Sequence, residues 1–119
     1  MIKRFQACFP ELTYDMDLCV NLANAQAFLD AGKKRVRLYG GLVRHRKIGA
    51  AGLALTLSHE TGHHLGGAPH LEYYHWLSSE ERATEWAVTV GLPSVFGSRR
   101  ATQIGREGFS QLRTLGLVN

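Results

Sequence analysis

The stretch His59-Glu60-Thr61-Gly62-His63 constrains the fold of this chain more than any other, because its spacing suits a helix. Residues four apart on a helix project from nearly the same face, so His59 and His63 can bring two imidazoles to one metal ion. Glu60 lies about 100° further round, where its carboxylate can reach a water beside that ion. The pattern HExxH is typical of zinc sites in which the glutamate acts as a general base. We therefore expect a helix here that carries a metal centre.

Two helices are predicted around this motif. The first runs from Ile48 to Leu65 and is rich in Ala and Leu, which favours a central, buried helix. The Gly-Gly-Ala-Pro run at 66–69 ends it. Ser78 and Glu81 fit a capping box, Ser-x-x-Glu, which predicts that a second helix begins there and continues to about residue 90.

A catalytic zinc site needs a third protein ligand besides the two histidines. In the pattern HExxHxxGxxH that ligand would fall at position 69, which is Pro69, so this pattern fails. His70 comes one residue too late, and His64 points about 100° away from His63, as a supporting or surface residue would. His75 is possible but has no recurrent ligand context around it. A glutamate from the next helix is the remaining option, and spacing alone does not choose among Glu80, Glu81 and Glu85.

The rest of the chain predicts three further elements. Apolar residues recur at helical spacing between Tyr14 and Ala31, and Gly32 is a suitable stop, so we expect a helix there. Val36 to Tyr39 alternates apolar and polar residues, as a half-buried strand does. Residues 98–115 are expected to form a last helix.

Length and composition favour one soluble domain spanning residues 1–119, with 45% hydrophobic and 20% charged residues. No apolar run approaches the ~20 residues that cross a bilayer, and the N-terminus lacks the apolar stretch of a signal peptide. We therefore expect a cytoplasmic protein without a membrane partner.

Cys8 and Cys19 are too few for a disulfide framework and belong to no CxxC pair, so both are expected to be reduced thiols.

The net charge of +4 is unevenly distributed. Segment 33–47 contains seven basic residues and no acid. Such a segment can meet nucleic-acid phosphates or an acidic partner, or can form a solvated face. No signature of the usual nucleic-acid-binding modules is present.

The stretch from Leu57 to Leu65, followed by Glu80 to Ala87 and by Gly91-Leu92-Pro93, resembles the ImmA/IrrE-type zinc metallopeptidases. That family reads HExxH, then Glu-x-Glu-Ala-Asn-x-Phe-Ala, then Leu-Pro or Met-Pro at the end of the helix. Asn24-Ala25-Gln26-Ala27 is also similar to a run ahead of HExxH in related gluzincins. Thr84 departs from the pattern, because the family has Asn or Asp there to hydrogen-bond a ligand histidine. Arg82 replaces the second glutamate.

The resemblance implies a minimal zincin-like α+β fold. A small, mostly antiparallel sheet would pack on the HExxH helix and on a glutamate-bearing helix. Zn²⁺ would be held by His59, His63 and Glu80, and Glu60 would activate the zinc-bound water that attacks a peptide bond. The substrate would be a protein, such as a repressor or another regulatory protein.

The same resemblance implies how that substrate is held. It would bind as an added strand along a sheet edge, for which Val36 to Tyr39 is the expected strand. Tyr73, Tyr74 or His75, in the loop between the two helices, would stabilise the oxyanion.

Two other functions stay open: a catalytically silent, zinc-stabilised interaction domain, and a nucleic-acid-binding module that uses segment 33–47. Gly62 is expected to be structural, because a Cβ there would block a neighbouring element.

Overall fold

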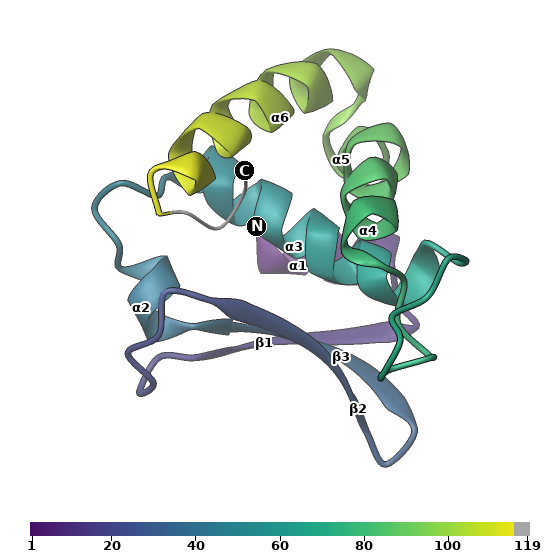
Figure 1. Ribbon diagram of the computed structural model, residues 1–119. Helices are drawn as coiled ribbons and strands as arrows, with labels where there is room; N and C mark the ends of the chain where they lie inside the picture. Colours follow the sequence, from purple (N-terminus) through teal and green to yellow (C-terminus); the bar gives the residue numbers. More distant parts are fainter. Residues whose placement is uncertain (116–119) are drawn as a thin grey trace.

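The computed structural model describes residues 1–115, in which a sheet lies on one side of the molecule and the longer helices pack over one of its faces (Figure 1). The strands are β1 (Leu12–Asp17), β2 (Ala25–Asp30) and β3 (Lys33–Tyr39). The helices are α1 (Ile2–Cys8), α2 (Gly40–Val43), α3 (Ala50–Leu65), α4 (Glu80–Trp86), α5 (Leu92–Phe96) and α6 (Ser98–Arg113), and a π-helical segment, η1 (Ala87–Gly91), joins α4 to α5. Residues 116–119 of the predicted domain lie outside the described residues.

The sheet has the strand order β1-β3-β2. β1 pairs with β3 in parallel, and β2 pairs with β3 antiparallel. The sheet is therefore mixed, and the expectation of a mostly antiparallel sheet was wrong. The strand predicted at Val36 to Tyr39 exists as part of β3, but it is the central strand. The expected edge position of this strand was therefore also wrong, because β1 and β2 flank β3 and form the two edges of the sheet.

The helix predicted between Tyr14 and Ala31 is absent, and this segment forms β1, a connecting loop and β2. Leu18 and Leu22, which supplied part of the helical spacing, are 48% and 54% exposed in the loop. Ala31 and Gly32 both adopt positive φ and close a two-residue turn between Asp30 and Lys33. Pairing with β3 decided the structure here, since local spacing was compatible with either outcome.

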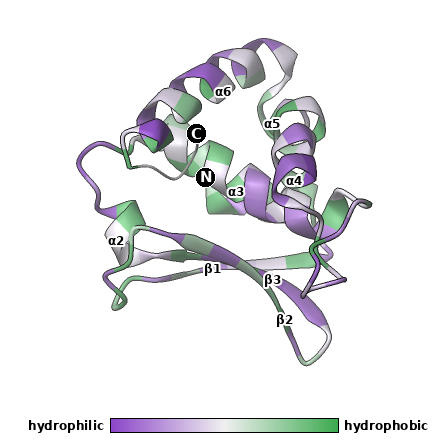
Figure 2. Ribbon diagram, viewed as in Figure 1, coloured by the Kyte–Doolittle hydropathy of each residue, from purple (hydrophilic) through white to green (hydrophobic). Residues whose placement is uncertain are grey.

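The core lies between the sheet and α3. Leu57 of α3 and Val36 of β3 are fully buried, together with Phe5 of α1. Figure 2 shows hydrophobic turns of α3 in the interior and hydrophilic residues along α6. The predicted helix 48–65 is thus confirmed as the central helix, and the prediction of a last helix at 98–115 is confirmed by α6.

The second predicted helix begins one residue later than its capping box required. Ser79 is the N-cap, and its hydroxyl accepts a hydrogen bond from the Arg82 backbone at 3.2 Å. The prediction of a Ser78–Glu81 capping box was therefore wrong, which leaves the Glu81 side chain free of that role. The helix also continues past Pro93, because this proline lies in the first turn of α5, where it needs no backbone N–H.

Cys8 and Cys19 are free and exposed, in agreement with the sequence. Among the described residues, no helix combines the length and the apolar character needed to cross a membrane.

Candidate metal centre

Helix α3 places His59 and His63 one turn apart, with their ring centres 4.7 Å from each other and their planes nearly perpendicular. The potential ligand atoms of His59, Glu60 and His63 all lie within 4.8 Å of one another. The predicted grouping of the motif's three polar side chains on one side of the helix is therefore present. It is a candidate metal site.

Both imidazoles are oriented by a partner on their Nδ1 side. His63 Nδ1 lies 2.7 Å from the backbone oxygen of Ser78, so it carries the proton and donates. His59 Nδ1 lies 3.0 Å from the hydroxyl oxygen of Thr84. When Nδ1 is the protonated nitrogen, Nε2 presents its lone pair to a metal. The contact with Thr84 agrees with the expectation that the residue at this position hydrogen-bonds a ligand histidine.

Glu80, the first residue of α4, closes the group. Its carboxylate oxygens lie 3.2 Å from His59 Nε2 and 2.9 Å from His63 Nε2. Among the three glutamates that spacing left open, Glu80 is the one in contact with both histidines. Two imidazole Nε2 atoms and one carboxylate thus converge on a common point, which fits the N and O donors that Zn²⁺ accepts.

The pKa shifts of Glu80 and His63 show that the space between these side chains favours positive charge. Hydrogen bonds with His59 and then His63 hold the pKa of Glu80 well below its usual range. Burial alone would lower the pKa of His63, but the hydrogen bond with Glu80 and the charge of Glu60 raise it above its ordinary value. A point between these groups is therefore a favourable place for a cation.

Glu60 differs from Glu80 in its surroundings. Burial raises the pKa of the Glu60 carboxyl, although the two neighbouring histidines act in the opposite direction. A carboxylate with a raised pKa takes up a proton more readily than an exposed one. Glu60 can therefore accept and return a proton, whereas the low pKa of Glu80 suits a permanently ionised ligand.

Close packing of α3 on α4 brings Glu80 to the histidines. A Cβ added to Gly62 would lie 2.6 Å from the carbonyl oxygen of Ala83 in α4. Only glycine permits this approach without a shift of the backbone. The expectation that Gly62 allows a close neighbour is confirmed, and the neighbour is the helix that carries Glu80.

Two residues of the motif region fasten α3 to the sheet. Thr61 donates its hydroxyl proton to Leu57 O and accepts a hydrogen bond, at 2.7 Å, from the Tyr14 hydroxyl of β1. His64 is buried and its Nε2 donates to the Arg35 backbone oxygen of β3 at 2.8 Å. His64 therefore supports the motif helix rather than the metal, as its direction on the helix predicts.

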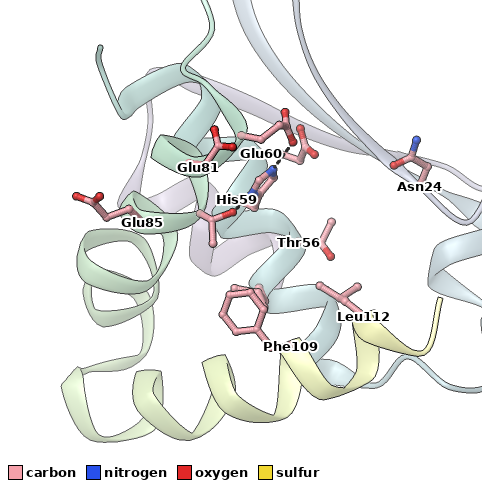
Figure 3. A pocket seen from close by; sticks show the side chains of 11 residues that line it. Asn24, Thr56, His59, Glu60, Glu81, Glu85, Phe109 and Leu112 are labelled. Atoms are coloured by element: carbon pink, nitrogen blue, oxygen red, sulfur yellow. Dashed lines mark hydrogen bonds and ion pairs between the residues drawn. The ribbon is translucent and has the colours of Figure 1, made fainter. Parts of the chain in front are cut away.

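Cavities lie on both sides of the site. The larger, of about 720 Å³, is bounded by α3, α4 and α6, and Figure 3 shows His59 and Glu60 within it. The smaller, of about 390 Å³, is bounded by β2 and by the loop that precedes α4. Asn24, Glu60 and Glu80 line both cavities. The two cavities therefore adjoin at the candidate metal site, and the smaller one extends along the edge strand β2; we call the two together the path.

Of the three residues predicted to stabilise an oxyanion, one lines a cavity beside the candidate metal site and two do not. Tyr74 lines the smaller cavity and contacts Trp76 edge to face. Tyr73 is 81% exposed, and neither it nor the exposed His75 lines either of these two cavities. Their suggested role stays a prediction, and Tyr74 is the one nearest the path.

Asn24 is a candidate that the sequence did not single out as a site residue. Its side-chain oxygen accepts a hydrogen bond from the Ala25 backbone at 2.8 Å, and its amide N–H groups donate to no residue in the range 1–115. The similarity of Asn24-Ala25-Gln26-Ala27 to gluzincins was the available signal. The mistaken helix over this segment concealed that it borders the site.

Three of the seven basic residues in segment 33–47 are engaged with the protein itself. Arg35 lies 2.6 Å from Asp15 and 2.7 Å from Asp30, and Arg37 lies 2.7 Å from Asp15. Arg44 donates to the Leu18 backbone oxygen. The arginines on the outer face of the sheet are therefore balanced by aspartates rather than gathered into a free positive surface.

Comparisons with known protein families, with curated proteins and with solved structures find no match to this chain. The resemblance to the metallopeptidases therefore rests on the quoted motifs and on the geometry of His59, Glu60, His63 and Glu80.

Proposed function

We propose that this protein is a zinc-dependent endopeptidase with His59, His63 and Glu80 as metal ligands. The observation that carries the proposal is the convergence of both Nε2 atoms on the Glu80 carboxylate, beside a half-buried Glu60. Two imidazoles and a carboxylate form a ligand set that zinc hydrolases use, and such a set leaves a fourth position open. A site that serves stability alone needs no general base next to it.

The residues of the chain would divide the work as follows. Bound zinc would supply Lewis acidity and lower the pKa of a water to about 7. Glu60 would take the proton from the attacking water at its carboxylate and return it to the leaving amine. Thr84 and the Ser78 carbonyl would hold the two imidazoles in the required orientation. The Asn24 amide would donate to the backbone of the substrate.

A peptide substrate would lie along β2 rather than along β3. β2 has one edge paired with β3, and its other side borders the path through the two cavities. An extended peptide can add to such an edge through backbone hydrogen bonds. This replaces the strand expected from the sequence and keeps the same mode of binding.

The two alternative functions have less support. Cavities on both sides of the site favour access of a substrate over a closed structural metal site. The pairing of Arg35 and Arg37 with aspartates argues against phosphate binding by this face of the sheet.

The test compares wild type with Glu60→Gln, both loaded with zinc, on a mixed-sequence peptide library read by mass spectrometry. We expect Glu60→Gln to retain stoichiometric zinc and its circular dichroism spectrum but to lose cleavage by about 10²–10⁴-fold. Glu11→Gln, an exposed glutamate outside these cavities, is the matched control and should cleave like wild type. Cleavage by Glu60→Gln at the wild-type rate would show that the assigned mechanism is wrong.

A further inference from the structure

The larger cavity has a charge opposite to that of the protein as a whole. The chain carries a net charge of +4, yet the residues that line this cavity include no Lys or Arg. They include four glutamates: Glu60, Glu80, Glu81 and Glu85. A cavity of this composition attracts cations and repels acidic groups.

The four carboxylates are not equivalent. Glu80 contacts the two histidines, Glu60 is the proposed base, and Glu85 lies 2.6 Å from Arg82. Glu81 forms no ion pair with any residue in the range 1–115. Because Ser79 rather than Ser78 caps α4, the Glu81 side chain is not held in a capping box and is available to the cavity. Glu81 is therefore the carboxylate that can receive a charged ligand.

The opposite wall of the cavity is apolar. Leu55 of α3 and Leu112 of α6 are buried, and Phe109 of α6 is half-buried. Figure 3 shows Phe109 and Leu112 on α6, Glu81 on α4 across the cavity from them, and the Glu85 side chain directed away from them. A matching ligand would have an aliphatic stem and a positively charged end. Lysine and arginine side chains have this form.

The smaller cavity has a different lining. Its carboxylates are only Glu60 and Glu80, and the loop side consists of Leu71, Tyr74, Trp76 and Leu77. This side offers apolar and aromatic surface without a carboxylate of its own. The preference for a cation is therefore confined to one side of the metal site.

We propose that the larger cavity selects a lysine or arginine side chain of the substrate, with Glu81 as the residue that determines this specificity. The proposal rests on the proposed endopeptidase function. A peptide antiparallel to β2 would direct its C-terminal part toward Asn24, where β2 begins, because antiparallel strands run in opposite directions. The selected residue is then the one that follows the scissile bond.

The test measures binding separately from cleavage. Peptide hydroxamates that differ only in the residue beside the chelating group carry Lys, norleucine or Glu, and their affinities for zinc-loaded protein are measured by calorimetry. We expect the Lys compound to bind about fivefold more tightly than norleucine and the Glu compound to bind most weakly, as for a partly exposed ion pair. Glu81→Gln should abolish the advantage of Lys, Glu85→Gln should reduce it less, and Glu11→Gln should leave it unchanged.

Equal affinity for Lys and norleucine, or an unchanged preference in Glu81→Gln, would overturn the assignment of the cavity. The same peptides with a scissile bond in place of the hydroxamate then test the reaction. A preference for Lys in binding without Glu60-dependent cleavage would refute the endopeptidase function and leave the cavity assignment standing. Glu60-dependent cleavage without a preference for Lys would refute the cavity assignment and leave the endopeptidase function standing.

Discussion

The hydroxyl oxygen of Thr84 lies 3.0 Å from Nδ1 of His59, at the position where the metallopeptidases that the motifs resemble have an amide or a carboxylate. A hydroxyl can accept the Nδ1 proton and so fix the tautomer that presents Nε2. It is neutral, however, so it increases the basicity of the imidazole less than a carboxylate does. The site thus keeps the orientation of His59 while its electrostatic support is weak.

Thr84→Val removes this acceptor and keeps the size and branching of the side chain. We expect zinc affinity to fall by about 10–100-fold, because His59 loses its orienting partner. Competition with a chromogenic chelator measures the change. Thr84→Ser, which retains the hydroxyl, should bind nearly as tightly as wild type. Thr89→Val, on the following turn and away from the site, serves as control; an equal loss in both valine variants would contradict the role of Thr84.

The identity of the third ligand is tested by removing one carboxylate at a time. Glu80 contacts both histidines, whereas Glu81 lines the cavity without an ion pair to them. We expect Glu80→Ala and His59→Ala to lose stoichiometric zinc after dialysis, and Glu81→Ala to keep it. Elemental analysis of the three variants beside wild type gives the answer. Retention of zinc in Glu80→Ala with loss in Glu81→Ala would reverse the assignment.

The sequence predicted the site better than it predicted the sheet. The helix under His59, Glu60 and His63 was identified correctly, because a long Ala- and Leu-rich segment with a clear stop forms a helix in most surroundings. Glu80 could be chosen only through the resemblance, since spacing treats it like Glu81. Its contacts with the histidines depend on how α4 packs over α3, which no local pattern encodes.

The largest error, a helix over residues 14–31, also has a physical cause. Its apolar residues matched a helical period, but Leu18 and Leu22 lie exposed in a loop. The true inward face alternates, with Tyr14 in β1 and Ala25 and Ala27 in β2 buried. These short strands obtain their hydrogen bonds from β3, so their formation depends on a partner that lies outside the segment. The same error concealed Asn24 and the edge strand.

Gly62 links the stability of the fold to the metal site. A methyl group at this position would meet Ala83 O at 2.6 Å, so Gly62→Ala must push α4 away from α3. We expect a loss of about 1–3 kcal/mol in the free energy of unfolding, as for other overpacked interiors. Zinc binding should also weaken, since Glu80 moves with α4. Urea denaturation and chelator competition measure the two effects.

Gly105 provides the matched control, because it is also a buried helical glycine. A Cβ there would make only ordinary contacts, at 3.9 Å, with Leu92 and Val88. Gly105→Ala should therefore be neutral or slightly stabilising, since alanine favours a helix. If Gly62→Ala were as stable as Gly105→Ala, the close approach of α3 and α4 would not be required.

Asp15 on the outer face of the sheet gives the protein a predictable response to acid. Hydrogen bonds from Arg37, and also from Arg35, hold the pKa of this carboxyl below its ordinary value, although partial burial acts in the opposite direction. The unfolded chain has the ordinary pKa of about 3.9, so the folded state binds this proton less readily than the unfolded one. The stabilisation by Asp15 is therefore complete above pH ~4 and is lost as the pH falls through the folded-state pKa.

Asp15→Asn tests this dependence. The variant should be less stable than wild type at pH 7, because Arg35 and Arg37 lose their charged partner, and this difference should shrink between pH 5 and pH 2.5. Urea denaturation of both proteins across that range measures it. Asp17→Asn is the control, since the Asp17 carboxylate accepts a hydrogen bond from the Cys19 backbone and forms no ion pair with an arginine among the described residues. A difference between wild type and Asp15→Asn that stayed constant down to pH 2.5 would mean that ionisation of Asp15 does not stabilise the sheet.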